Sequence, residues 1–96
     1  MPVVRDQLLK PLGYEQLTSA GAVLVPTVPA GACRIMIVAE TKAIRIRDDG
    51  TNPSGTVGFI IPANTIYYYT SSKPGALRII EDGGTSTAKI NLLYYA

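Results

Sequence analysis

Few side chains in this sequence are of types that could do chemistry. The 96 residues contain no histidine, which removes the commonest general base and the commonest metal ligand. The single cysteine, Cys33, lies between apolar neighbours, and without a histidine little would activate its thiol as a nucleophile. We therefore interpret Cys33 as a small buried residue and expect that the chain is not an enzyme.

Two acidic pairs, Asp48/Asp49 and Glu81/Asp82, are the candidate ligands for a cation. Carboxylate oxygens suit Ca²⁺, but the spacing does not match an EF-hand loop. Each pair directly precedes a glycine, where aspartate stabilises turns by accepting hydrogen bonds from nearby backbone N–H groups. Turn stabilisation is the favoured interpretation, with metal binding and paired carboxylates for glycoside hydrolysis as alternatives. We expect no metal and no cofactor.

Five of the six tyrosines occur in two runs, Tyr67-Tyr68-Tyr69 and Tyr94-Tyr95. Tyrosine can stack on sugars or bases, and it also supplies amphipathic contact area at protein interfaces. In a strand, Tyr67 and Tyr69 share one face and Tyr68 lies on the other. We expect these residues to lie in the core or a subunit interface, and a ligand platform is the alternative.

Arginine alternates with isoleucine just before the first acidic pair. Arg45 and Arg47 therefore project from the face opposite to Ile44 and Ile46. Exposure to solvent is the simplest interpretation of these two side chains. The more specific interpretation is that they pair with carboxylates of a partner protein, so both arginines are candidate interface residues.

The elements that must position these side chains are strands. Period-2 alternation and clustered turn residues predict about eight of them and no helix of normal length. Residues 43–61 read as a strand, a polar turn and a second strand with Val57, Phe59 and Ile61 on one face. Residues 41–42 predict a tight hairpin, and residues 22–28 an edge strand or one broken at Pro26. The other strands are expected at 14–18, 33–40, 65–70, 76–80 and 87–95.

The strand plan repeats within the chain. Residues 76–83 restate residues 43–50 at an offset of 33, and the same offset relates the Pro-Ala turns at 29–30 and 62–63. Units 29–61 and 62–94 would then share one plan, although coincidence is a competitor because β meanders reuse few residue types. The prediction is an all-β fold: a single-domain, jelly-roll-like β-sandwich with an internal pseudo-repeat.

Residues 1–13 differ from the sandwich domain expected at 14–96. The segment 4–10 could form one or two helical turns, ended by Pro11 and Gly13, and would be marginal by itself. We expect a short N-terminal arm that packs on its own domain or on a neighbouring subunit. Its apolar side chains are candidate interface residues: Val3, Val4, Leu8 and Leu9.

Composition narrows the classes of partner. The hydrophobic fraction of 47% is high for so short a chain, which suits either a compact β domain with few charges or an oligomer. The formal net charge is only +2, and the basic residues are scattered, so we expect no nucleic-acid partner. No apolar run is long enough for a membrane span and no secretory signal is recognisable, so we expect no membrane partner and assembly in a cytoplasm.

One stretch carries a family resemblance. The residues "IRIRDDGTNPSGTVG" at 44–58, with Tyr67–Tyr69, Leu77–Ile80 and Asn91–Tyr95, look like small virion proteins of tailed bacteriophages. The resemblance spans about residues 20–96 and leaves the arm uncovered. It implies a structural role in head decoration, cementing or tail parts, and it has no catalytic residues to carry over.

These inferences together predict a capsid decoration or cement protein, located in the virion and assembled in the host cytoplasm. The expected partners are the major capsid protein or other virion proteins, and we expect a homo-oligomer, with a trimer favoured. A tail or head–tail accessory protein is the first alternative. A carbohydrate-binding module that uses Tyr67–Tyr69 is the second.

Overall fold

The computed structural model describes residues 9–18, 21–84 and 87–96. It confirms an all-β fold, with strands and one short 3₁₀ turn, η2 (Pro74–Ala76), in the described part of the chain. The strands are β1 (Pro11–Leu17), β2 (Arg34–Glu40), β3 (Ile44–Arg47), β4 (Phe59–Ile61), β5 (Tyr67–Thr70), β6 (Arg78–Glu81) and β7 (Lys89–Tyr95). No helix within these residues is long and apolar enough to span a membrane.

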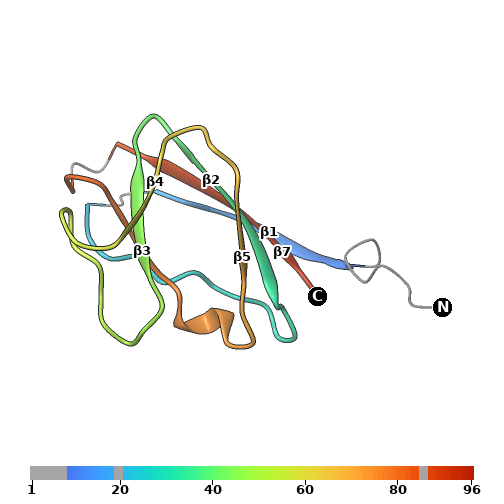
Figure 1. Ribbon diagram of the computed structural model, residues 1–96. Coiled ribbons are helices and arrows are strands. Elements are labelled where there is room, and N and C mark those ends of the chain that lie inside the picture. The colour runs from blue at the N-terminus through green and yellow to red at the C-terminus, as the bar shows by residue number, and fades with distance from the viewer. Residues whose placement is uncertain (1–8, 19–20, 85–86) are drawn as a thin grey trace.

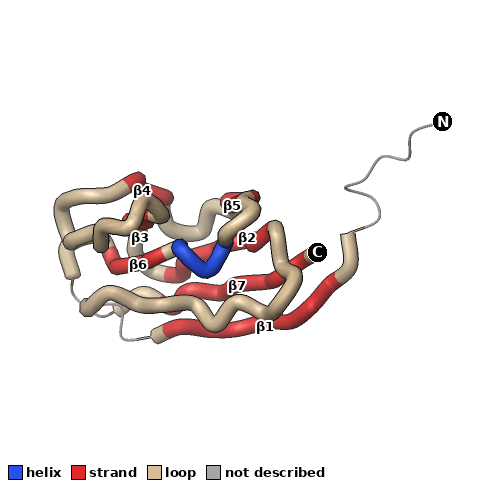
Figure 2. The backbone as a smooth tube through the Cα atoms, turned by 90° about the horizontal axis from the view of Figure 1, so that it is seen from below, coloured by secondary structure: helices blue, strands red, loops and turns tan. Residues whose placement is uncertain are grey.

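The strands form two antiparallel sheets (Figures 1 and 2). Sheet A has the order β1-β7-β2-β5, and sheet B has the order β4-β3-β6. The hairpin predicted at residues 41–42 is wrong, because β2 and β3 belong to different sheets. Thr41 instead turns the chain from one sheet to the other with a positive φ of 72°, and its Oγ1 donates to the carbonyl of Thr87 at 2.9 Å.

The strand–turn–strand unit at 43–61 is present as the antiparallel pair β3–β4. Ile44 lies opposite Ile61, and Ile46 lies opposite Phe59. The turn is closed by reciprocal backbone hydrogen bonds between Ser54 and Val57. The predicted apolar face is only partly buried, since Ile61 is 2% exposed while Val57 and Phe59 are 52% and 58% exposed.

Two segments differ from the strands predicted from the sequence. Residues 22–28 do not form a strand; Leu24 makes a single antiparallel bridge to Ile79 at the outer edge of β6, and Pro26, which has no N–H to donate, follows two residues later. The described residues therefore contain seven strands. At the N-terminus β1 begins at Pro11, so residues 11–13 belong to sheet A and not to the arm. The helical turns expected at 4–10 fall mainly outside the described residues.

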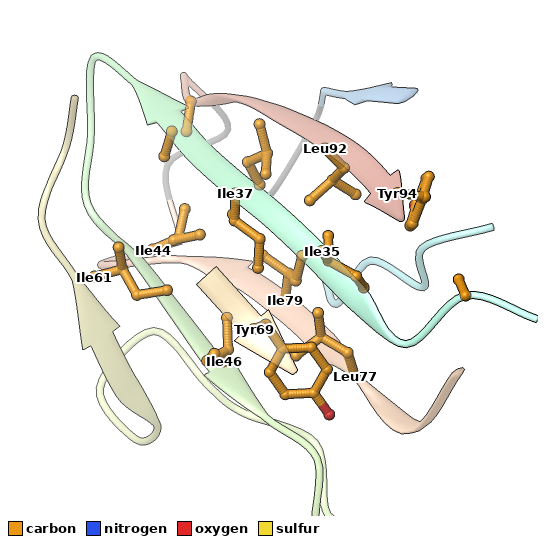
Figure 3. Packing of buried hydrophobic residues seen from close by; sticks show 14 residues of the cluster. Ile35, Ile37, Ile44, Ile46, Ile61, Tyr69, Leu77, Ile79, Leu92 and Tyr94 are labelled. Carbon is orange, nitrogen blue, oxygen red and sulfur yellow. The ribbon is translucent and has the colours of Figure 1, made fainter. Parts of the chain in front are cut away.

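One hydrophobic core receives side chains from both sheets (Figure 3). Strict alternation on β2 sends Ile35, Ile37 and Ala39 into it, each 0% exposed. Ile44 and Ile46 come from β3, and Ile79 comes from β6. Burial of a side chain of this size stabilises a fold by about 1.5–3 kcal/mol, so the alternation of apolar residues is the main reason for the two-layer arrangement.

At one end of this core, Tyr94 is 2% exposed and its hydroxyl donates to Glu15 Oε1 at 2.6 Å. Burial, and then the hydrogen bond to the Glu15 carboxylate, raise the pKa of Tyr94 well above its ordinary value. Glu15 Oε1 also accepts a hydrogen bond from the backbone N–H of Thr27 at 2.9 Å. Tyr94 thereby ties β7 to β1 and, through Glu15, to the segment that precedes β2.

This arrangement predicts a loss of stability at alkaline pH. Because the folded state holds the phenol protonated, its contribution is fully present below the unfolded tyrosine pKa of about 10 and declines as the pH rises above it. Urea unfolding between pH 9 and pH 11 should give a falling free energy of unfolding, and Tyr94→Phe should make that fall smaller. Equal slopes for the parent and the variant would contradict this role of Tyr94.

Candidate functional site

A hollow on the surface lies where β3 ends and β4 and β5 begin. It has a volume of about 350 Å³ and adjoins a smaller one of about 140 Å³. Four residues line both hollows, so we treat them as one feature, the β3–β5 groove. Its lining residues are Ile46, Arg47, Asp48, Asp49, Val57, Gly58, Phe59, Tyr67 and Tyr69.

The apolar wall of the groove is aromatic. The rings of Phe59 and Tyr67 lie 5.6 Å apart between centroids and are tilted by 48°, a geometry favourable for aromatic pairs. Tyr67 is half-buried, whereas Phe59 is 58% exposed and the neighbouring Val57 is 52% exposed. An edge strand that exposes such side chains presents surface that water solvates poorly.

The polar wall consists of hydrogen-bonded groups. Arg47 Nε donates to Asp49 Oδ1 at 3.0 Å and Arg47 Nη2 donates to Asp49 Oδ2, a two-point pairing that raises the pKa of Arg47 and lowers that of Asp49. The Tyr69 hydroxyl donates to Asp48 Oδ2 at 2.7 Å. Burial, followed by this hydrogen bond, raises the pKa of Tyr69.

These hydrogen bonds involve both carboxylates that line the groove, Asp48 and Asp49. Each of its two carboxylates already accepts hydrogen bonds from a side chain of the same chain. Among residues 9–18, 21–84 and 87–96, no three of the His, Cys, Asp and Glu side chains gather as a metal would need. The groove combines an exposed aromatic surface with a border of hydrogen-bonded polar groups.

The acidic pairs do not act alike. Asp49 accepts a hydrogen bond from the backbone N–H of Thr51, as the turn interpretation predicts. Asp82 instead forms an ion pair with Arg45, with 2.7 Å between Oδ1 and Nε. Glu81 is fully buried, and its Oε1 accepts hydrogen bonds from the backbone N–H groups of Thr87, at 2.6 Å, and Ala88.

The predicted interface residues divide between several places. Arg47, Tyr67 and Tyr69 meet in the groove. Arg45 does not, because its guanidinium contacts Asp82 and donates to the carbonyl of Gly58 at 3.1 Å. Tyr68 points away from the core and is 57% exposed. In the arm, Leu9 is half-buried, while Val3, Val4 and Leu8 lie outside the described residues.

Other exposed apolar residues lie on the outer face of sheet A, the side turned away from the core. Tyr14 is 60% exposed and Leu93 is 37% exposed. Sequence reasoning did not select them, and it placed Val57 and Phe59 on one strand face with Ile61 without naming them as interface residues. Alternation along β1 and β7 could have indicated which way Tyr14 and Leu93 point, but their exposure depends on which strands lie beside them.

No protein-family model, curated protein sequence or solved structure matches this chain. The candidate functional surfaces of the described residues are the β3–β5 groove and the outer face of sheet A.

Proposed function

We propose that this chain is a non-enzymatic structural protein of a bacteriophage virion, of the decoration or cement type, that binds the head shell. The observation that carries the proposal is the exposed apolar ridge beside the groove. The ridge consists of Val57 and Phe59, which both line the groove and are 52% and 58% exposed. Apolar side chains that gather on one side of a small domain are characteristic of a surface covered by another protein.

The proposed partners are the major capsid protein or other virion proteins. Cementing requires contact area repeated over many copies more than it requires chemistry, because multivalent contacts add up even where each one is weak. The aromatic wall would supply the apolar contact. The Arg47–Asp49 pair would border it with groups that can exchange hydrogen bonds with a partner.

The architecture that we propose for this role is a jelly-roll-like β-sandwich of two similar units. The offset of 33 relates β2 to β5 and β3 to β6, and both related pairs are hydrogen-bonded neighbours. The Leu24 bridge adds a fourth member to sheet B, in keeping with two four-stranded sheets. The similarity ends at the third strand of each unit, since β4 lies in sheet B and β7 in sheet A.

Adding the purified protein back to heads assembled without it tests this proposal. We expect saturable co-sedimentation of many copies per head. The double variant Val57→Ser/Phe59→Ser should bind at least tenfold more weakly. Val25→Ser is the matched control, because Val25 is 57% exposed but follows the Leu24 bridge at the opposite edge of sheet B. Absence of binding to heads, or equal loss in both variants, would refute the proposed role of the ridge.

Carbohydrate binding is the second candidate, and the groove itself favours it. An exposed aromatic ring, Phe59, lies beside the Arg47–Asp49 pair, and stacking on a ring bordered by hydrogen-bonding groups is one way to hold a sugar. A glycan array with Tyr68→Ala and Phe59→Ala variants separates the two functions. A saccharide bound by the parent and lost in Phe59→Ala would favour this candidate, and no binding would dismiss it.

A further inference from the structure

The dipeptide Asp-Gly occurs twice in this chain, as Asp49-Gly50 and as Asp82-Gly83. In such a dipeptide the aspartate carboxyl group is open to attack by the next backbone nitrogen, because glycine has no Cβ to shield that nitrogen and is free in its backbone angles. Each copy follows the end of a strand of sheet B, β3 or β6. Their surroundings in the folded chain differ, so the two copies can be compared with the dipeptide itself held constant.

Asp82-Gly83 is held in place by three interactions. The N–H of Gly83 donates to the carbonyl of Gly55 at 2.9 Å. The N–H of Asp82 donates to the carbonyl of Ala43, also at 2.9 Å, and Asp82 Oδ1 lies 2.7 Å from Arg45 Nε. Attack by the Gly83 nitrogen would have to break its hydrogen bond and turn the Asp82 carboxyl group away from Arg45, so the fold opposes the reaction here.

Asp49-Gly50 has more freedom. Both residues are exposed, the space around the Cβ position of Gly50 is open, and within the described residues the Gly50 N–H makes no hydrogen bond. Asp49 Oδ1 accepts a hydrogen bond from the N–H of Thr51 at 3.4 Å. The ring of atoms that this bond closes contains the Gly50 nitrogen, so the carboxyl group is folded towards the atom that would attack it.

We propose that Asp49 is a site of spontaneous conversion to isoaspartate in the folded protein, and that Asp82 is protected from the same reaction. The Gly50 nitrogen forms a bond to Cγ of Asp49, and its proton leaves with the hydroxyl of the neutral carboxyl group as water. The product is a cyclic succinimide. Water then opens the ring at the main-chain carbonyl carbon of Asp49, so that the main chain runs through Cβ and Cγ and the former main-chain carbonyl becomes the free carboxylate.

Arg47 controls this step because it holds the carboxyl group that must react. Its Nε donates to Asp49 Oδ1 at 3.0 Å, and its Nη2 donates to Asp49 Oδ2. This hydrogen bonding lowers the pKa of Asp49, and an ionised carboxylate has no hydroxyl group to release with the amide proton as water. The reaction therefore requires separation of Asp49 from Arg47 and protonation of the carboxylate, so loss of the Arg47 side chain should accelerate it.

The conversion would change the β3–β5 groove, because Arg47 and Asp49 both line it. Isoaspartate adds one carbon to the main chain and moves the free carboxylate, so the two-point pairing with Arg47 cannot keep its geometry. The inference goes beyond the proposed function and does not depend on it, since the reaction requires neither a head shell nor any other partner.

Incubation of the purified protein at neutral pH and about 37 °C, followed by peptide mass spectrometry, is the test. Trypsin places the two dipeptides in separate peptides, 48–78 and 79–89, and fragmentation by electron transfer identifies isoaspartate in each. In the folded protein Asp49 should convert at least about tenfold faster than Asp82. In concentrated urea, where the fold protects neither site, the two rates should agree within about threefold.

Two variants test the assignment, and circular dichroism and urea unfolding verify that each is folded. Arg47→Ala should convert at Asp49 at least about threefold faster than the parent, with the rate at Asp82 unchanged. Gly50→Ala, in which a Cβ shields the attacking nitrogen, should convert at Asp49 at least about tenfold more slowly. Equal rates at the two sites in the folded protein, no isoaspartate at Asp49 while the unfolded protein converts, or an Arg47→Ala variant no faster than the parent would overturn the proposal.

Discussion

Replacement of Glu81 by alanine is expected to lower the free energy of unfolding by about 2–4 kcal/mol, since each buried donor left without an acceptor costs about 1–3 kcal/mol. Glu81 is 0% exposed, and its carboxylate accepts hydrogen bonds from the backbone N–H groups of Thr87 and Ala88. These two residues directly precede β7, so the carboxylate joins the end of sheet B to the start of a strand in sheet A.

The matched variant is Glu81→Gln, which keeps the shape and one acceptor oxygen. It should lose clearly less stability than Glu81→Ala when both are measured by urea unfolding at pH 7. If the two variants are equally unstable, the acceptor role is wrong and the negative charge itself matters. If both are as stable as the parent, the carboxylate contributes nothing to the fold.

Gly58→Ala is expected to cost about 2–4 kcal/mol, and it tests the hairpin that carries the groove. Gly58 has a φ of +144°, a conformation that costs a residue with a side chain about 1–3 kcal/mol. A Cβ there would also lie 3.0 Å from Arg45 Cβ and 3.1 Å from Pro53 Cβ. These neighbours would have to move, and Arg45 is fixed by its ion pair with Asp82.

Two other glycines separate the cost of the backbone conformation from the cost of the close contacts. Gly50 has a φ of +88° but open space around its Cβ position, so Gly50→Ala should show the cost of the backbone conformation alone, about 1 kcal/mol. Gly75 has neither constraint, so Gly75→Ala should stay within about 1 kcal/mol of the parent. The order of stability Gly75→Ala, Gly50→Ala, Gly58→Ala is expected in thermal or urea unfolding. Gly58→Ala as stable as Gly50→Ala would exclude close packing at the hairpin.

The parts of the fold that local pattern determines could be predicted from the sequence. Alternation of Ile44 and Ile46 with arginine, followed by a cluster of turn residues, was sufficient to predict the β3–β4 hairpin. The same reasoning failed at residues 41–42, because a short polar break looks alike whether it closes a hairpin or carries the chain between sheets. The pairing of β2 with β5 and β7 decides that β2 and β3 lie in different sheets. Those partner strands lie far along the chain.

The candidate site was predictable only in part for the same reason. Tyr67 and Tyr69 were correctly placed on one face and Tyr68 on the other, since this depends on alternation alone. Arg45 and Arg47 looked equivalent, yet only Arg47 lines the groove, because Asp82, 37 residues away, pairs with Arg45. The exposure of Tyr14 and Leu93 on the outer face of sheet A depends on the order of four strands at once, which no local pattern contains.

Counting the copies of this chain in purified virions tests its proposed role most directly. Cryo-EM of the particle, with the density of this domain assigned and counted, gives both the number of copies and their place. A decoration or cement protein should cover the head in stoichiometric copies, with the Val57–Phe59 ridge against the shell. A few copies confined to the tail, or none on the particle, would contradict it.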